Sequence, residues 1–282
     1  MMLRSLLFVP ADSQRKLAKA RETEADALVL DWEDSVGDGE KAAARRRTVE
    51  ALGAGSPRGQ VMLVRVNRAG SDAFREDCQA LSARLPDGIM LSKCSAADVH
   101  ELAQFLCNRD PESTCGICPL IETASGLLNG RAIAGSSERV FALGLGAEDL
   151  SAELGLRRTE EEIELLYARS ALVAAARAAG CEVFDSPCVT LNDEKKIAAA
   201  AARARNLGFS GMMAIHPEQI SVLNAAFSPN EDELDWARRT LEASSNGGVS
   251  RIGNRMVDEA IVRQARRILR LQAGSVKRDV AS

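Results

Sequence analysis

The sequence has no excess of basic residues: 36 lysines and arginines stand against 40 aspartates and glutamates. Clustered positive charge is the electrostatic mark of a nucleic-acid-binding protein, and here the basic residues are scattered, so we expect no nucleic-acid partner. No run reaches the roughly 20 apolar residues that cross a bilayer. The short apolar opening, residues 3–10, is followed by Asp12 before any small-residue cleavage site, unlike a secretion signal. We therefore expect a cytoplasmic protein without a membrane partner.

Paired cysteines are also scarce. The seven cysteines are an odd number spread through predicted strands and helices, which fits reduced thiols better than a disulfide framework. Cys115 and Cys118 have a CxxC spacing, but they enter a predicted strand, whereas redox pairs usually begin a helix. No second pair completes a zinc site. We favour a packing role, with a redox or zinc role as the alternative.

The chain contains eight apolar runs that alternate with helical patterns. Its 282 residues, 46% of them hydrophobic, can bury the core of one barrel of about 250 residues. Strands separated by helices predict right-handed β-α-β units and a parallel sheet. The predicted strands are residues 5–10, 27–31, 61–66, 88–92, 116–121, 140–144, 181–184 and 211–215. Eight such strands close a (β/α)8 TIM barrel, which is the fold class we predict.

Helix boundaries between the strands have recognisable capping residues. Thr159 and Glu162 have the spacing of a capping box, and Gly180 can end the helix that this box would begin. Ser95, three residues before Asp98, predicts the start of another helix.

The sequence continues for about sixty residues after the eighth strand, more than one closing helix needs. We expect a TIM-barrel catalytic domain over residues 1–227 and a C-terminal helical extension, or lid, over residues 228–282. Ser228 is predicted to cap a helix that has Pro229 at its first position and ends near residue 243. A loop at 244–248 and a final amphipathic helix are expected to follow.

Glu122 and Asp149 each stand at the end of a short apolar run. A strand buried on both faces has no use for a carboxylate inside, but its C-terminal end opens at the face where barrel active sites lie. Two acids so placed can hold a hard divalent ion. Further polar residues follow the other predicted strands, and they would be costly there unless they pair with one another or bind a ligand. These further residues are Asp31, Glu33, Asp34, Arg65, Asn67, Lys93, Glu148, Asp185 and His216.

Seven segments carry a resemblance to a known family. They are RSLLFVP (4–10), DWEDSV (31–36), VRVN (64–67), IETA (121–124), GAEDL (146–150), AIHP (214–217) and GNRMVD (253–258). With these segments the chain resembles the citrate lyase beta-subunit family, the group of citryl-, malyl- and citramalyl-CoA lyases within the HpcH/HpaI aldolases. The likeness runs from the first segment to about residue 270 with the segments in the right order.

The resemblance implies a magnesium-dependent barrel enzyme that cleaves or forms a carbon-carbon bond beside a coenzyme A thioester. Glu122 and Asp149 match the metal ligands of the family. Glu33 and Asp34 match acids that hold metal-bound waters. Arg65 matches the arginine that binds the substrate near the thioester enolate.

Two further segments acquire expected roles from the same resemblance. Gly146, Ala147 and Glu148 match the loop whose backbone amides receive the substrate carboxylate. Asp258 matches an aspartate that, in malyl-CoA lyase-like members, reaches the site of a neighbouring subunit, so a homo-oligomer is expected and a trimer is favoured. Asp258 also precedes an amphipathic helix, and an N-cap is an equally supported role for it.

The residue types suit this chemistry. Mg²⁺ prefers oxygen ligands and usually retains waters, so two carboxylates leave positions for a 2-oxo acid. Arg65 is permanently charged and can form paired hydrogen bonds to an enolate or a carboxylate. Its alternative role is to bridge the acids across the barrel mouth.

The leading interpretation is a magnesium-dependent lyase that converts a small β-hydroxyacyl-CoA to acetyl-CoA and a 2-oxo acid. Alternatives with the same site are a beta subunit acting on citrate bound to an acyl-carrier protein, a thioesterase, or a malate-synthase-like condensing enzyme. A metal-free aldolase with a Schiff base on Lys93 is a further alternative. The family pattern commonly has lysine where this chain has Met212 and proline where it has Ser92. Charge for the coenzyme A phosphates would then come from Lys93, Arg15 or Lys16.

Overall fold

The computed structural model describes residues 3–245, 250–252 and 255–279. The chain forms two compact units: Leu3–Asn224, and a second unit that begins at Ala225.

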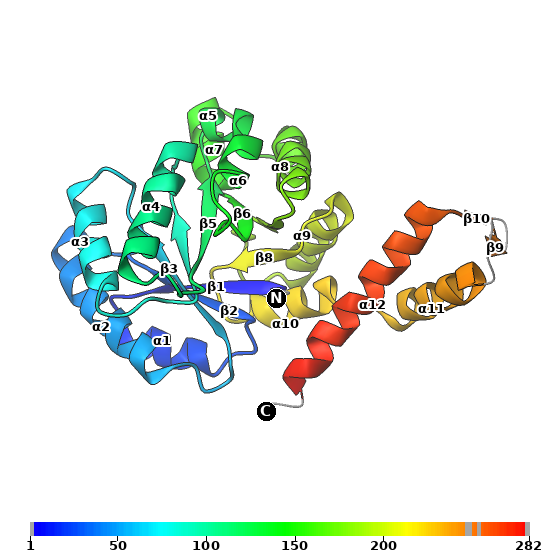
Figure 1. Ribbon diagram of the computed structural model, residues 1–282, viewed down its shortest axis with the longest axis horizontal. Coiled ribbons are helices and arrows are strands. Elements are labelled where there is room, and N and C mark those ends of the chain that lie inside the picture. The colour runs from blue at the N-terminus through cyan, green and yellow to red at the C-terminus, as the bar shows by residue number, and fades with distance from the viewer. Residues whose placement is uncertain (1–2, 246–249, 253–254, 280–282) are drawn as a thin grey trace. The chain divides into compact units, whose positions relative to one another are not determined.

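The first unit is a closed barrel of eight parallel strands (Figure 1). Each strand pairs with the next one along the chain, and β8 pairs with β1. The strands are β1 (Ser5–Pro10), β2 (Ala27–Asp31), β3 (Val61–Val66), β4 (Gly88–Leu91), β5 (Gly116–Ile121), β6 (Ala142–Leu145), β7 (Glu182–Asp185) and β8 (Gly211–Ala214). The predicted TIM barrel is confirmed, and all eight predicted strands are found with their ends shifted by at most two residues.

The strands form because their residues are β-branched or otherwise apolar and are buried on both faces. Every residue of β2 is buried, as a strand between an inner core and an outer layer of helices requires. Alternate residues of neighbouring strands, among them Leu6, Val29, Leu63 and Phe184, join one hydrophobic cluster. This spacing of two residues is the period at which side chains of a strand share a face.

The barrel closes where β8 meets β1, with Ser5 opposite Met212. A Cβ atom on Gly211 would lie 2.1 Å from the carbonyl oxygen of Leu3, so only glycine permits the two backbones to approach so closely. The hydroxyl of Ser5 donates a 2.7 Å hydrogen bond to Oδ1 of Asn224. This seam therefore joins residues that are more than 200 positions apart in the sequence.

Ten α-helices connect or follow these strands in the described part of the barrel and its end. They are α1 (Gln14–Arg21), α2 (Lys41–Ala54), α3 (Asp72–Leu81), α4 (Ala96–Arg109), α5 (Ala124–Leu128), α6 (Gly130–Ala134), α7 (Ala147–Leu154), α8 (Leu166–Ala178), α9 (Glu194–Leu207) and α10 (Gln219–Phe227). The predicted capping box of Ser95 and Asp98 begins α4. Gly180, at φ 76°, follows the end of α8 as predicted.

The helix predicted from Thr159 begins later than expected. Thr159 Oγ1 does accept the amide of Glu162 at 3.2 Å, but the amide of Thr159 donates to Glu164 at 2.9 Å. Glu162 itself has a left-handed backbone (φ 50°), and its carboxylate accepts a 2.8 Å hydrogen bond from Arg169. The Glu162 carboxylate thus binds Arg169 and Arg203 instead of accepting the amide of Thr159. The capping box stays half-formed, and α8 begins only at Leu166 after a 3-10 turn, Ile163–Leu165.

The CxxC cysteines contribute packing. Cys115 and Cys118 are both free and buried. Burial raises the pKa of the Cys115 thiol to about 12 and raises the pKa of Cys118 as well, so both stay protonated at neutral pH. A thiol must ionise to act as a nucleophile or a metal ligand, which supports the packing interpretation.

The second unit contains α11 (Glu231–Ser245), β9 (Ser250–Ile252), β10 (Arg255–Val257) and α12 (Glu259–Asp279). The antiparallel pair of β9 and β10 was not predicted from the sequence. The predicted cap at Ser228 is wrong: Asn230 Oδ1 accepts the amide of Glu233, and the Glu233 carboxylate accepts the amide of Asn230, both at 2.9 Å. Of the predicted loop at 244–248, the first two residues belong to α11 and the rest lie outside the described residues.

None of the helices in the described residues has the length and apolar character needed to span a membrane.

Candidate active site

The carboxyl ends of the barrel strands form a mouth whose central cation is Arg65, at the end of β3. Its Nε and Nη2 atoms each donate a 2.7 Å hydrogen bond to a different oxygen of Asp31, at the end of β2. The guanidinium also lies 5.0 Å from the ring centroid of Phe8. Although burial pushes the pKa of Asp31 upward, the paired hydrogen bonds from Arg65 outweigh it and hold that pKa below its ordinary value. The pKa of Arg65 is raised by the acids around it despite its burial.

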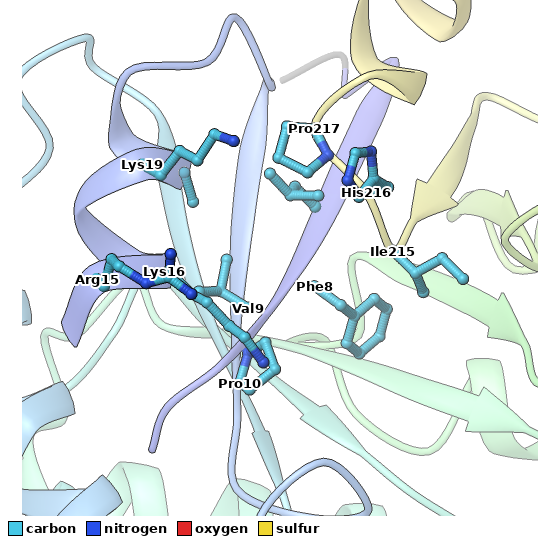
Figure 2. A pocket seen from close by; sticks show the side chains of 11 residues that line it. Phe8, Val9, Pro10, Arg15, Lys16, Lys19, Ile215, His216 and Pro217 are labelled. Atoms are coloured by element: carbon cyan, nitrogen blue, oxygen red, sulfur yellow. The ribbon is translucent and has the colours of Figure 1, made fainter. Parts of the chain in front are cut away.

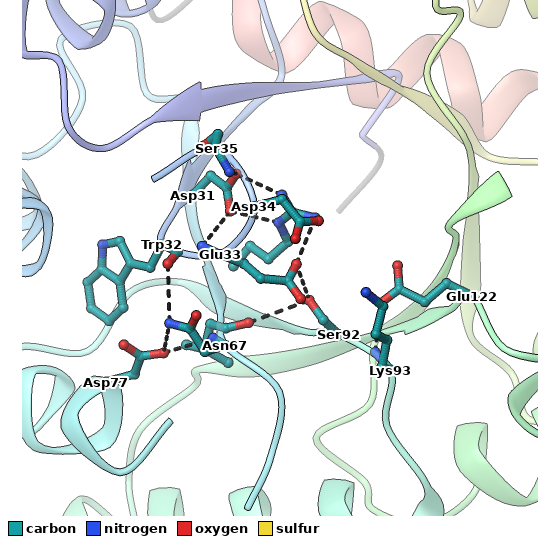
Figure 3. Close-up of polar contacts among 12 residues, drawn as sticks. Asp31, Trp32, Glu33, Asp34, Ser35, Asn67, Asp77, Ser92, Lys93 and Glu122 are labelled. Carbon is teal, nitrogen blue, oxygen red and sulfur yellow. Dashed lines mark hydrogen bonds and ion pairs between the residues drawn. The ribbon is translucent and has the colours of Figure 1, made fainter. Parts of the chain in front are cut away.

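The same guanidinium reaches two further acids, as predicted for the bridging role. Its Nη1 lies 2.9 Å from Oε2 of Glu33 and 3.4 Å from Oδ2 of Asp34. Glu33 also accepts a 2.9 Å hydrogen bond from the Ser92 hydroxyl, as Figure 3 shows. Burial raises the pKa of Glu33, because Arg65 compensates only part of the lost solvation.

Lys41, near the start of α2, fixes the backbone below these acids. Its Nζ donates to the carbonyl oxygens of Trp32 and Glu33 at 2.8 and 3.1 Å, and to Oδ1 of Asn67 at 2.9 Å. Asn67 in turn donates to Asp77 at 2.8 Å (Figure 3). This network holds the loop after β2, and two of its side chains, those of Lys41 and Asp77, were not among the predicted site residues.

Glu122, at the end of β5, is buried on the opposite side of the mouth. Its Oε1 accepts a 2.7 Å hydrogen bond from the backbone amide of Lys93, at the end of β4 (Figure 3). Burial, followed by the neighbouring charge of Glu33, raises the pKa of Glu122 to about 8. A buried carboxylate with this surplus of negative neighbours favours a cation beside it.

Asp149 lies in the first turn of α7, and 41% of its side chain is exposed. Its Oδ1 is 2.9 Å from Nζ of Lys93. Both predicted metal ligands thus contact Lys93: Glu122 accepts its backbone amide, and Asp149 pairs with its ammonium. The hydrogen bond to Asp149, above all, raises the pKa of Lys93, which is the opposite of what a Schiff-base lysine needs.

Of the three backbone amides predicted to receive the substrate carboxylate, at residues 146–148, the first is already hydrogen-bonded within the barrel. The amide of Gly146 donates to the carbonyl oxygen of Ile121 at 3.0 Å and so completes the sheet. The amides of Ala147 and Glu148 open α7, where helical geometry provides them with no intrahelical acceptor. Those two amides fit the predicted carboxylate-binding role, while the carboxylate of Glu148 pairs with Arg158.

Asp258 belongs to the second unit and caps α12. Its Oδ1 accepts a 2.9 Å hydrogen bond from the amide of Ile261. The capping role is thus observed, while the catalytic role of Asp258 stays a prediction.

A magnesium ion fits the donor set of the mouth. Within the described residues no group of three or more histidines, cysteines or acids is spaced to enclose a metal ion. Mg²⁺ does not need such a cage, since it commonly uses one or two carboxylates and keeps waters or substrate oxygens. Glu122 and Asp149 offer two hard oxygen donors of this kind, and Glu33 adds negative charge close to Glu122.

The Glu122 side chain lies in space that is open only because residue 146 is a glycine. A Cβ atom at residue 146 would lie 2.5 Å from both Cβ and Oε2 of Glu122. We predict that Gly146→Ala displaces the carboxylate and weakens magnesium binding at least about tenfold, since ligand geometry and outer contacts set metal affinity. Calorimetric titration with Mg²⁺ checks this, with Gly53→Ala, in open space within α2, as the comparison variant. Equal affinities in wild type and Gly146→Ala would contradict the prediction.

The raised pKa of Glu122 predicts a pH dependence for the metal-free protein. Below pH 4.5 the carboxyl is protonated in both the folded and the unfolded chain; between 4.5 and about 8 only the folded chain keeps the proton. The free energy of unfolding should therefore fall as pH rises through this window, by at most about 1.4 kcal/mol per pH unit for one proton. Urea unfolding in the presence of a chelator, from pH 5 to 8, measures this slope. Glu122→Gln should flatten it, and an equal slope in both proteins would contradict the assignment.

A pocket of about 280 Å³ opens beside the mouth between β1, α1 and the end of β8. Arg15, Lys16 and Lys19 of α1 line one side and His216 lines the other (Figure 2). Phe8, Val9 and Pro10 of β1 line the pocket between them (Figure 2). Three cations beside an otherwise largely apolar pocket suit a ligand that has phosphate groups and an apolar portion.

A closed parallel barrel with acids and an arginine at its carboxyl-end mouth has the architecture of a TIM-barrel enzyme. The profile of the family described as HpcH/HpaI aldolase/citrate lyase matches residues 4–217. The chain is 36% identical to citrate lyase subunit beta of Escherichia coli K12, over 94% of this chain and 92% of that protein. It is 32% identical to a (3S)-malyl-CoA thioesterase of Cereibacter sphaeroides strain KD131, over 94% and 93% of the two chains.

A solved structure is similar over almost the whole chain. Protein CitE from Mycobacterium tuberculosis, in complex with magnesium, acetoacetate and coenzyme A, superposes with a TM-score of 0.80 at 31% identity. The match covers 96% of this chain and 98% of that one. The chain therefore belongs to the HpcH/HpaI aldolase/citrate lyase family, which confirms the resemblance seen in the sequence and makes it an enzyme of the lyase type.

Proposed function

We propose that this protein is a magnesium-dependent carbon-carbon lyase that cleaves a small β-hydroxyacyl-CoA of the citryl-, malyl- or citramalyl-CoA type. The products would be acetyl-CoA and a 2-oxo acid. The observation that carries the proposal is the buried carboxylate of Glu122, set beside Asp149 at the mouth of the barrel. Magnesium and coenzyme A in the related CitE structure support it.

Each residue of the mouth has a task in this reaction. Glu122 and Asp149 would hold the ion, with Glu33 and Asp34 holding its waters. When bound, Mg²⁺ acts as a Lewis acid toward the oxygens of the 2-oxo acid portion. The amides of Ala147 and Glu148 would orient the substrate carboxylate at the helix N-terminus.

Arg65 would stabilise the charge that the cleavage creates. The β-hydroxyl loses its proton and becomes the carbonyl of the 2-oxo acid as the bond between the α and β carbons breaks. The electron pair of that bond forms the enolate of acetyl-CoA, which then takes up one proton. The guanidinium is already fixed by its paired contacts with Asp31, so it need not reorganise during the reaction. Asp258 is proposed to assist proton transfer from a neighbouring subunit in a homotrimer.

The basic pocket beside β1 would receive the coenzyme A phosphates. Arg15 and Lys16 line it, as expected for residues that compensate for Met212, whereas Lys93 points its ammonium to Asp149. This assignment separates Lys93, which contacts the proposed metal site, from the three cations of α1 that face the coenzyme.

Incubating the protein with Mg²⁺ and each of citryl-, malyl- and citramalyl-CoA tests the proposal. Formation of acetyl-CoA and a 2-oxo acid from one ester, abolished by EDTA, is the expected result. Free coenzyme A with an intact hydroxy diacid would instead indicate a thioesterase, the activity named for one relative. Cleavage only of a substrate bound to an acyl-carrier protein would indicate a subunit of a citrate lyase complex. Light scattering during size-exclusion chromatography tests the trimer.

A further inference from the structure

Ser92 and Lys93, at the end of β4, together contact three acids of the mouth. Figure 3 shows two of these acids, Glu33 and Glu122. The Ser92 hydroxyl donates to Glu33 and the Lys93 amide donates to Glu122, at 2.9 and 2.7 Å. The Lys93 ammonium lies 2.9 Å from Asp149. One dipeptide therefore supplies a hydroxyl, a backbone amide and a full positive charge to three different carboxylates.

The backbone of Lys93 is held in an unusual conformation that permits these contacts. Its φ of 48° lies in the left-handed region, and only Glu162 and Asn192 share a positive φ among the non-glycine residues of the described chain. A lysine has no intrinsic preference for this region, so surrounding contacts must maintain it. In this conformation the amide bonds Glu122 while the side chain reaches Asp149.

We propose that Lys93 is a resident counter-cation of the metal site, whose ammonium neutralises Asp149 until a divalent ion displaces it. The inference rests on the proposed magnesium site. Oδ1 of Asp149 is in ion-pair contact with the ammonium. A magnesium ion bound to the same carboxylate at about 2.1 Å would bring two cations together, and their repulsion favours movement of the ammonium away from Asp149.

The two functions of Lys93 are separable, because they use different atoms. The amide anchors Glu122 whatever the side chain at residue 93 is, whereas only the ammonium competes for Asp149. Removing the ammonium should therefore leave Glu122 in place and make metal binding tighter. If Lys93 merely positioned Asp149 as a ligand, its removal would weaken metal binding instead.

Binding of Mn²⁺, followed by the electron paramagnetic resonance signal of the free ion, distinguishes these outcomes in the full-length protein without any substrate. Lys93→Met should lower the dissociation constant about tenfold, since it removes both the ion pair to be broken and the repulsion of a nearby charge. Lys93→Asn should do the same, and asparagine tolerates the left-handed backbone. Lys93→Arg retains a competing cation and should stay within about twofold of wild type.

Lys196→Met is the matched control, because Lys196 forms an exposed ion pair with Glu160 at 2.7 Å. It should leave Mn²⁺ affinity unchanged. Equal or weaker affinity in both Lys93→Met and Lys93→Asn, with wild type binding one ion, would overturn the counter-cation role alone. Two results would overturn the metal site itself, and the inference with it. One is that wild type does not bind Mn²⁺, and the other is that Glu122→Gln does not abolish the binding.

Discussion

Glu122→Gln is expected to lower kcat/KM for magnesium-dependent cleavage of the CoA ester by about 1,000-fold, because Lewis-acid stabilisation by a bound metal is worth several kcal/mol. The amide oxygen of glutamine can still accept the 2.7 Å hydrogen bond from the Lys93 amide, so the local geometry should persist. What is lost is the negative charge and one ligand. Steady-state assays of acetyl-CoA release over a range of Mg²⁺ concentrations measure the effect.

Two comparisons make the loss specific to the site. Glu160→Gln removes an exposed carboxylate that pairs with Lys196, and it should leave kcat/KM unchanged. The metal-free Glu122→Gln protein should be at least as stable as wild type at pH 8, because burial disfavours the charged form of Glu122. Activity near the wild-type level in a folded Glu122→Gln protein would refute Glu122 as a metal ligand.

The second large effect is expected on stability, from Arg65→Met. Loss of this guanidinium would leave Asp31 and Glu33, both buried, without their shared cation. Removing one partner of a buried ion pair typically costs about 3 to 5 kcal/mol, and we expect the free energy of unfolding to fall by that amount. Urea unfolding at neutral pH, with substrate and metal absent, measures it.

A double-mutant cycle identifies the source of that loss. Asp31→Asn combined with Arg65→Met removes both members of the paired contact, so it should recover part of the stability lost in the single Arg65→Met variant. Arg65→Lys keeps the charge but cannot reproduce the two 2.7 Å bonds to Asp31, and it should be intermediate. Strictly additive losses for Asp31→Asn and Arg65→Met would show that their contact does not stabilise the fold.

The strands could be predicted because their pattern is local. An apolar run such as Ala27–Asp31, buried throughout and followed by acids, indicates a barrel strand without any knowledge of its neighbours. The capping box at Ser95 is predictable for the same reason, since its donors and acceptors lie within three residues. The later start of α8 was not predictable, because Glu162 binds Arg169 and Arg203, which lie outside the predicted capping box of Thr159 and Glu162.

The acids of the candidate site could be predicted from their position at strand ends, but their partners could not. The Asp31 and Arg65 pair joins residues 34 positions apart, and only the register of β2 against β3 brings them face to face. The role of Lys93 depends on its positive φ, and no amino-acid pattern around residue 93 indicates that conformation. Sequence therefore predicts which residues gather at the mouth, and the backbone conformation decides how they are paired.

The seam between β1 and β8 constrains how this protein is made. Ser5 has no partner in the sheet until Met212 has been synthesised, and β8 completes the barrel only when both edges have formed. A nascent chain that ends before Gly211 would expose two unpaired strand edges, and such edges are templates for aggregation. The barrel therefore leaves the edge of β1 open to such pairing until Gly211–Ala214, the last strand, has been synthesised.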